Sequence, residues 1–367
     1  MIIPFVDLKA QYLSIKKEID TTIQNVINET AFINGKYVKL FEEEYADAYR
    51  VKHCISCANG TDAIYITLKA LGVGPGDEVI TTALSWISTS ETITQAGARV
   101  VFVDIDPYFY TIDIKRIEEK ITAKTKAIIP VHLFGQPVEI EKIRQTCEQY
   151  NLHLIEDCAQ AHFAEYNNEK VGTFGVAGTF SFFPGKNLGA YGDAGAIITN
   201  DDDFAVKARM YANHGALIKH KHEVEGINSR LDGMQAAILS VKLKYVSGWN
   251  EKRLKNALLY NKLLTDIDSI AIPQIRENVK HVFHLYVIRA ANREALQKHL
   301  AEKGVSTGIH YPTPLPLLPA YRYLNHTPSD FPIASDYMNK ILSLPMFPGL
   351  KEEQIQYVSN LIKEFYI

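Results

Sequence analysis

Seven short runs of apolar and β-branched residues recur up to residue 200. Within each run the apolar positions follow one another, without the alternation of a half-exposed strand. Continuous runs of this kind are typical of strands buried on both faces, so we expect a mostly parallel central sheet covered by helices, an α/β fold. The predicted strands are 53–56, 78–82, 99–105, 126–133, 152–157, 178–183 and 195–200.

Helical patterns lie between these runs and dominate the end of the chain. Residues 61–72 and 138–151 are predicted helices between strands. Beyond about residue 245 the pattern changes to a long amphipathic helix over 248–267, a strand at 283–290 and two further helices. Fewer strands, and no glycine-rich strand-to-helix turns, predict a smaller α+β domain there. The expected domains are residues 1–245 and residues 246–367.

Composition and charge narrow the classes of function. The 367 residues are 47% hydrophobic and 22% charged, as in ordinary soluble proteins. A net charge of −3 gives no global reason to expect nucleic acid, although a local pocket for a phosphorylated ligand remains compatible with it. No apolar stretch is long enough to span a membrane, and the N-terminal segment lacks a signal-peptide pattern. We expect a cytoplasmic protein that binds neither nucleic acid nor membrane.

The four cysteines offer little for metal or disulfide chemistry. Cys54 and Cys57 have the C-x-x-C spacing of zinc and redox sites, but Cys147 and Cys158 do not form a second pair. Without a secretory signal, reduced thiols in the core are favoured over a zinc site or a disulfide.

Polar residues follow three of the predicted strands, where ligands of open α/β sheets collect. Gly60 and Thr61 follow the first strand and begin a helix, so their segment either binds a phosphate or is a simple N-cap made by Thr61. Asp157 and Gln160 follow the strand at 152–157. A buried carboxylate needs a partner, so Asp157 either caps a helix or holds a protonated heterocyclic nitrogen.

Lys186 follows the strand at 178–183, in "SFFPGKNLGAYGDAG". Its amine can form a Schiff base if its pKa is lowered, and the neighbouring glycines allow close approach. A phosphate-loop NTPase is excluded, because no Ser or Thr follows the lysine and the glycine spacing is wrong. A solvated loop lysine is the simpler alternative. Lysine, acid and helix-start glycine together are what pyridoxal phosphate (PLP) needs for its aldehyde, pyridine nitrogen and phosphate.

Four segments, "CANGTDAI", "EDCAQAH", "SFFPGKNLGAYGDAGAI" and "GINSRLDGMQAAIL", resemble the DegT/DnrJ/EryC1/StrS family of PLP-dependent sugar aminotransferases. The resemblance runs from "FVDLKAQY" to the last helix. It implies the aspartate-aminotransferase-like fold of type I PLP enzymes, with PLP as cofactor and no metal. It also implies a homodimer whose two subunits share each active site.

The resemblance assigns roles residue by residue. Lys186 would carry the cofactor and later move protons, and Asp157 would pair with the pyridinium nitrogen. Gln160 would lie near the phenolic oxygen of the ring, and Trp86 would stack on the ring. The phosphate would be held by Gly60, Thr61 and Ser181 together with Asn228 of the partner subunit, and the sugar nucleotide would lie near His310 and Tyr311.

Simpler interpretations remain open for some of these residues. Trp86 is also compatible with core packing, and His310 and Tyr311 with a packed turn before Pro312. The loop "NHGALIKHKHEVEG" contains three histidines, but their spacings match no metal-ligand pattern, so a mobile loop over the active site is favoured.

The activity that follows is transfer of an amino group from L-glutamate to a keto nucleotide-sugar, in amino-sugar biosynthesis for a surface polysaccharide. A dTDP-linked 3-keto-6-deoxyhexose is the expected acceptor, with a UDP-linked 3-keto sugar next and a 4-keto sugar third. Relatives that remove a hydroxyl carry histidine at the lysine position, which Lys186 argues against. A noncatalytic regulatory protein of the same fold is the remaining alternative.

Overall fold

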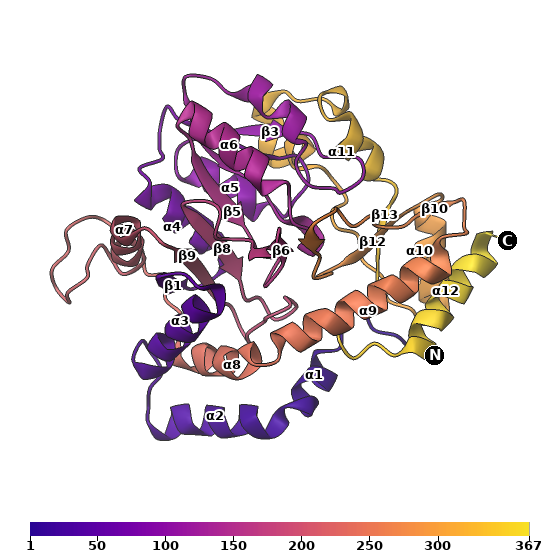
Figure 1. The fold of residues 1–367 in the computed structure, drawn as a ribbon, viewed down its shortest axis with the longest axis horizontal. Helices are drawn as coiled ribbons and strands as arrows, with labels where there is room; N and C mark the ends of the chain where they lie inside the picture. The colour runs from indigo at the N-terminus through magenta and orange to yellow at the C-terminus, as the bar shows by residue number, and fades with distance from the viewer. Residues whose placement is uncertain (367) are drawn as a thin grey trace.

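A computed structural model describes residues 1–366 and places all seven predicted strands in one central sheet (Figure 1). The strands lie in the order β1-β9-β8-β5-β4-β2-β3. Only β9 runs antiparallel to its neighbours, whereas all other pairs are parallel, which confirms the mostly parallel sheet. Their bounds are β1 (His53–Cys57), β2 (Glu78–Thr82), β3 (Arg99–Val103), β4 (Thr125–Ile129), β5 (His153–Asp157), β8 (Ala177–Ser181) and β9 (Gly195–Thr199).

Helices cover both faces of this sheet (Figure 1). Leu154 and Ile155, consecutive residues of β5, point to opposite faces and join separate hydrophobic cores. The expectation of strands buried on both faces is therefore confirmed. The α-helices are α1 (Leu8–Ser14), α2 (Lys16–Asn28), α3 (Lys36–Tyr49), α4 (Gly60–Ala70), α5 (Ser88–Gln95), α6 (Ile140–Tyr150), α7 (Asp202–Ala212), α8 (Gly233–Leu243), α9 (Val246–Leu264), α10 (Arg293–Glu302), α11 (Pro332–Tyr337) and α12 (Glu352–Tyr366).

The C-terminal part contains the predicted long helix, α9, which runs from α8 towards α10 and α12 (Figure 1). A second sheet there has the order β10-β12-β13, and a third small sheet joins β11, β6 and β7. Ile3 packs into the C-terminal core, and its N–H donates to the Gly304 carbonyl at 2.9 Å. The boundary between the two expected domains, after residue 245, stays a prediction. The short strands are β6 (Glu165–Tyr166), β7 (Glu169–Lys170), β10 (Ile270–Ala271), β11 (Val279–Lys280), β12 (Tyr286–Ala290) and β13 (Ile341–Leu344).

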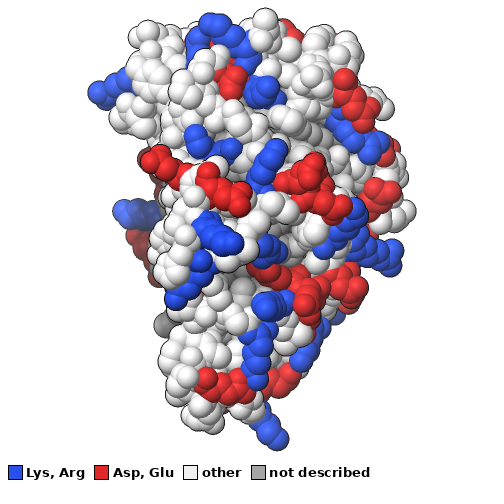
Figure 2. Space-filling view, turned by 90° about the vertical axis from the view of Figure 1, so that its left-hand side faces the viewer, with Lys and Arg blue, Asp and Glu red and all other residues white. Residues whose placement is uncertain are grey.

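Some predicted strands are longer than the observed ones. The run predicted over 126–133 ends as β4 at Ile129, because Pro130 has no N–H to continue the ladder. The residues beyond these early ends form the loops of the site. No helix within residues 1–366 is long and apolar enough to cross a membrane. On the face shown in Figure 2, basic and acidic side chains are interspersed, so that face has no large patch of one sign.

Candidate active site

A cavity of about 700 Å³ lies at the carboxyl ends of the parallel strands. Its walls come from segments far apart in the sequence, which the sheet order brings to one edge. Asn228 is the one predicted site residue that does not line it. The predicted residues that do are Gly60, Thr61, Trp86, Asp157, Gln160, Ser181, Lys186, His310 and Tyr311.

The N-terminus of α4 forms one wall. Asn59 is its N-cap and accepts the Asp62 N–H at 2.8 Å, so the interpretation of Thr61 as the cap is wrong. The Thr61 hydroxyl instead lies 2.7 Å from that of Ser88, at the cavity wall. The backbone at residue 60 lies so close to Ser181 that only glycine fits, because a Cβ at this position would lie 2.5 Å from Ser181 Cβ. Gly60 and Ser181 thus form a narrow cradle at a helix N-terminus, the arrangement suited to a phosphate.

Asp62 modifies this wall in two ways. Its N–H is engaged by the cap, so this backbone donor is not available to a phosphate. Its carboxylate accepts a hydrogen bond from Ser229 Oγ at 2.6 Å. That bond ties the α4 terminus to the segment that carries Asn228.

Asp157 ends β5 and is almost fully buried. No helix begins in residues 158–164, so Asp157 is not a helix cap. Its carboxylate accepts hydrogen bonds from Thr89 Oγ1 at 2.8 Å and from the Ala159 N–H at 3.1 Å. Burial raises its pKa, opposed by the Thr89 bond. Among the residues described it forms no ion pair, so a cation bound in the cavity would satisfy its charge.

Lys186 lies in the loop after β8. The Lys186 N–H closes a turn onto the Phe183 carbonyl at 2.8 Å, across Pro184 and Gly185. Burial lowers the pKa of Lys186 to about 8, and the Asp157 charge opposes that shift. Near neutral pH the neutral, nucleophilic form of this amine is still the minor one, but it is far more abundant than in an ordinary lysine, which argues against the simple solvated lysine.

The loop that carries Lys186 is fixed at several points. Asn187 donates to Asn250 Oδ1 at 2.8 Å and to the Val282 carbonyl at 3.0 Å. The buried Lys242 donates to the Gly189 carbonyl. A Cβ at Gly189 would lie 2.4 Å from the Pro184 carbonyl oxygen, so the loop folds back on itself only with glycine there.

Gln160 and Tyr311 form a second fixed pair in the cavity. Gln160 Nε2 donates to Tyr311 Oη at 2.9 Å, and Gln160 Oε1 accepts the Phe134 N–H at 2.7 Å. Burial raises the pKa of Tyr311, so it stays a neutral donor.

His310 stacks on Phe5 with ring centroids 5.6 Å apart, and burial lowers its pKa to about 4. His310 and Tyr311 both line the cavity, as predicted, so they do not form merely a packed turn before Pro312.

Trp86 is 59% exposed although it lines the cavity, so the interpretation of Trp86 as a core residue is wrong. Its ring lies 5.9 Å from that of Tyr311, at 46°. A large aromatic face left open beside a cavity is available to stack on a planar ligand. Its role in stacking stays a prediction.

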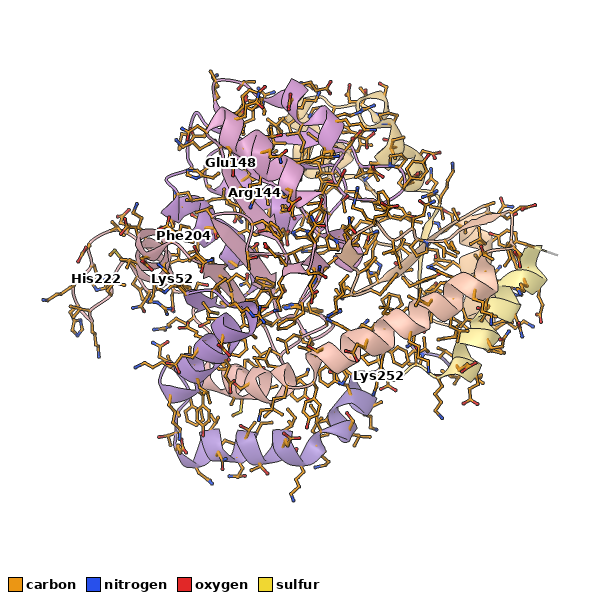
Figure 3. The ribbon with its side chains drawn as sticks, viewed as in Figure 1. Lys52, Arg144, Glu148, Phe204, His222 and Lys252 are labelled. Atoms are coloured by element: carbon orange, nitrogen blue, oxygen red, sulfur yellow. The ribbon has the colours of Figure 1, made fainter. Side chains whose placement is uncertain are left out.

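Asn228 lies on the exposed surface, after the loop that follows α7. This loop projects from the left of the molecule, and His222 is labelled on it (Figures 1 and 3). In the part of the chain that the structure describes, its three histidines do not come together as a metal-ligating group. The mobility of the loop, and the reach of Asn228 to a partner subunit, stay predictions.

Sequence reasoning missed several residues of the cavity wall and its surroundings, and two of these contact the predicted site residues or their neighbours. His284 lines the cavity, hydrogen-bonds Asn187 Oδ1 at 3.1 Å, and has a pKa held far below its usual range by burial and by Lys186. The strand predicted at 283–290 begins only at Tyr286, which leaves His284 in a loop. Thr89, the donor to Asp157, had no signal beyond a common helical composition.

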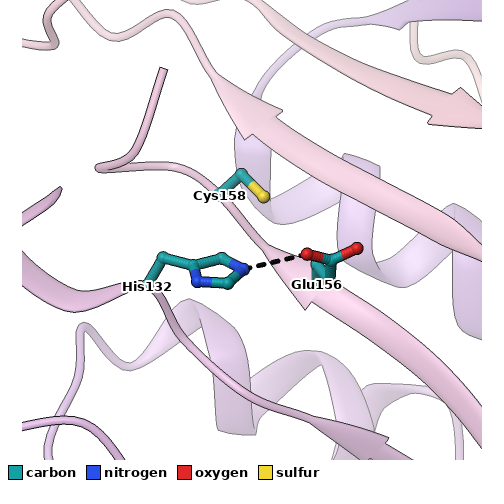
Figure 4. Close-up of side chains that lie close together, drawn as sticks. All are labelled: His132, Glu156 and Cys158. Carbon is teal, nitrogen blue, oxygen red and sulfur yellow. Dashed lines mark hydrogen bonds and ion pairs between the residues drawn. The ribbon is translucent and has the colours of Figure 1, made fainter. Parts of the chain in front are cut away.

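A buried cluster of His132, Glu156 and Cys158 lies behind the site (Figure 4). His132 Nε2 is 3.0 Å from Glu156 Oε2, which also accepts the Gly172 N–H at 2.7 Å. Glu156 Oε1 accepts the Phe174 N–H at 2.7 Å. These bonds satisfy the carboxylate within the protein, so the cluster anchors loops around β5. The thiols of all four cysteines are free and buried, as expected.

These residues fit PLP. The cradle at Gly60 and Ser181 suits a phosphate, the unpaired buried Asp157 suits a pyridinium nitrogen, and Lys186 has the lowered pKa that bonding to an aldehyde requires. When bound, PLP supplies an electron sink for carbanion chemistry.

This chain is similar over nearly its whole length to several named proteins. A "Pleiotropic regulatory protein" of Geobacillus stearothermophilus is 50% identical over 100% of this chain and 99% of its own. A "dTDP-3-amino-3,6-dideoxy-alpha-D-galactopyranose transaminase" of Aneurinibacillus thermoaerophilus is 41% identical over 99% of both chains. A crystal structure of S. venezuelae DesV matches with a TM-score of 0.97 and 36% identity, covering 100% of this chain and 98% of that one.

Other relatives carry the names of aminotransferases for dTDP- and UDP-linked sugars. One similar solved structure is described as holding the PMP form of the cofactor. The model of the DegT/DnrJ/EryC1/StrS aminotransferase family matches residues 13–363. The fold expected from the resemblance is confirmed, and the chain belongs to this family of PLP-dependent sugar aminotransferases.

Proposed function

We propose that this protein transfers the amino group of L-glutamate to C3 of a dTDP-linked 3-keto-6-deoxyhexose. The observation that carries the chemistry is the pair Lys186 and Asp157, with shifted pKa values at the wall of one cavity. This pairing suits amino transfer, in which a base moves a proton next to an electron sink.

Lys186 serves two functions in this proposal. Its Nζ would hold PLP through the aldehyde, and it would also serve as the base that takes and returns the proton of the reacting carbon. Asp157 would hold the ring nitrogen of PLP, and the positive charge of that nitrogen would offset the effect of burial and keep the carboxylate ionised. We expect Gln160 and Tyr311, which are hydrogen-bonded to each other at the cavity wall, to donate to oxygens of the ring and the sugar.

The choice of C3 rests on the substrate-orienting segments. Residues 238–253 and 308–321 resemble those of enzymes that make 3-amino sugars. The relative from Aneurinibacillus thermoaerophilus, by its name, also acts on a dTDP-linked 3-amino sugar. A displacement of about 1 Å at the reacting centre costs roughly a hundredfold in rate, so a site that presents C3 would process a 4-keto sugar poorly. A UDP-linked 3-keto sugar is the second candidate.

We also propose an obligate homodimer in the cytoplasm, serving the synthesis of a surface polysaccharide. Lys186 is the one lysine or arginine on the described wall of the cavity, beside the acids Asp62, Asp157 and Asp193. A nucleotide diphosphate needs more positive charge or more donors than this wall offers. Asn228 of the partner subunit would supply one such donor to the cofactor phosphate.

The name of the relative from Geobacillus stearothermophilus keeps a regulatory function as the second candidate. Purified protein that is yellow, and loses that colour when glutamate is added, supports the transferase. Assay of a panel of keto nucleotide-sugars then identifies the acceptor. A yellow protein that responds to no amino donor would support the regulatory alternative instead.

A further inference from the structure

A second cavity, of about 120 Å³, adjoins the first behind Lys186. The two share Val6, Gly185 and Lys186 in their walls. Helices α1 and α9 and the segment 347–349 enclose the rest of it. Arg253 and Lys252, both on α9, add two positive charges to this wall, whereas the main cavity has only Lys186.

Arg253 is only 4% exposed, yet it forms no ion pair with any residue in the described part of the chain. Its Nη1 donates to three backbone carbonyls, of Phe283, His284 and Met346, at 2.9–3.3 Å. Nε is buried and has no acceptor, and Nη2 makes no hydrogen bond to another described residue. Nε is enclosed by protein atoms, whereas Nη2 is the guanidinium nitrogen left free to donate to an anion in the cavity.

Lys252 is the second cation of this wall and lies on α9 near α1 (Figure 3). It is exposed, and within residues 1–366 no acid pairs with it. Asp7 is the one acid on this wall, and its Oδ1 accepts the Ala10 N–H at 2.8 Å as the cap of α1. The wall thus has an excess of positive charge and a free donor at Arg253 Nη2, which together favour the binding of an anion.

We propose that this second cavity binds the side-chain carboxylate of the amino donor. The inference rests on the proposed function, since it assigns the site that selects glutamate. The α-carboxylate is bonded to the reacting carbon and must stay in the main cavity, whereas the side-chain carboxylate reaches beyond Lys186. Nη2 of Arg253 donates a charge-assisted hydrogen bond to this carboxylate, and Lys252 adds an exposed positive charge.

Three variants of the holoenzyme test the site: Arg253→Lys, Lys252→Met and, as the control, Lys255→Met, an exposed α9 residue outside the cavity. The rate at which the yellow colour is lost is measured against the concentration of glutamate, and separately of glutamine. Arg253→Lys should raise the half-saturating glutamate concentration about tenfold. Lys252→Met should raise it about threefold, because that charge is more exposed. Neither should change the value for glutamine, and the control should match wild type.

Binding without chemistry gives an independent readout. Calorimetry should show that wild-type holoenzyme binds glutarate more tightly than butyrate, and that Arg253→Lys removes this preference. Equal losses for glutamate and glutamine, or an unchanged preference for glutarate, would overturn the inference. Colour loss with glutamate in wild type, alongside unaffected variants, would reject the subsite alone. No colour loss with any donor would reject the proposed function itself.

Discussion

Asp157 ends β5, Lys186 follows the neighbouring strand β8, and the charge of each opposes the pKa shift that burial causes in the other. Both line one cavity beside the cradle of Gly60 and Ser181. The sheet topology thus sets the relation between the nucleophile, the acid and the phosphate cradle. Substitutions at each position have different expected outcomes.

Lys186→Ala should abolish amino transfer and the covalent attachment of PLP. No other lysine lines the main cavity, so no other described amine can replace it. The protein should fold, with a circular dichroism spectrum like that of wild type, and should still bind PLP without the yellow lysine adduct. Turnover near the wild-type level would show that Lys186 is not the nucleophile.

Asp157→Asn should leave PLP bound but slow turnover by at least about a hundredfold, because an amide does not stabilise a charged ring nitrogen as a carboxylate does. Titration of the apoenzyme with PLP measures affinity, and colour loss with glutamate measures the chemistry. Thr89→Val, which removes one hydrogen bond to the same carboxylate, should have a much smaller effect. Unchanged turnover in Asp157→Asn would make Asp157 a structural residue.

The rate at which the apoenzyme attaches PLP should depend on pH through Lys186. Its pKa lies near 8, below the usual 10.5, and only the neutral amine attacks an aldehyde. The rate should therefore rise about tenfold per pH unit below pH 8 and level off above it. His310 titrates near 4 and does not interfere. Stopped-flow absorbance from pH 6 to 9.5 measures the profile, and a midpoint near 10 would contradict it.

Gly60→Ala should weaken PLP binding, because the added Cβ would lie 2.5 Å from Ser181 Cβ and fill the cradle. Gly74→Ala is the matched control, since a Cβ there meets no atom closer than 3.8 Å. The dissociation constant of PLP should rise at least about tenfold for Gly60→Ala and stay unchanged for the control. If Gly60→Ala and Gly74→Ala bound PLP with equal affinity, the phosphate would not bind at the cradle of Gly60 and Ser181.

A shared active site predicts complementation. Mixed under conditions that exchange subunits, inactive Lys186→Ala and Asn228→Ala chains should form some dimers in which one site has both wild-type residues. Activity should then reappear, up to about a quarter of the wild-type value per chain by random pairing of the two variants. Sedimentation that finds a fully active monomer would argue against the homodimer.

The residues of the site differ in how far the sequence predicted them. Strand ends were predictable, since buried strands have continuous apolar runs, and these ends placed Asp157 and Lys186 correctly at one cavity. His284 was not predictable, because its position depends on where a strand of the second sheet begins. Arg253 had no signal either, since its surroundings result from three carbonyls brought together by folding.

At Trp86 and Thr61 the sequence allowed two interpretations, and only the structure decides between them. An aromatic residue between predicted elements is equally compatible with a core or a cavity wall, and only the fold shows that Trp86 is open to the cavity. The cap of α4 depends on backbone angles, which favour Asn59 over Thr61. The role predicted for Asn228 involves a second chain, so one subunit alone does not test it.

The position that receives nitrogen is the central claim. Holoenzyme is supplied with L-glutamate and, separately, with the dTDP-linked 3-keto and 4-keto 6-deoxyhexoses, and NMR of each product locates the new C–N bond. The account predicts efficient conversion of the 3-keto sugar, with nitrogen on C3, and little or no conversion of the 4-keto sugar. Efficient conversion of only the 4-keto sugar, with nitrogen on C4, would contradict it.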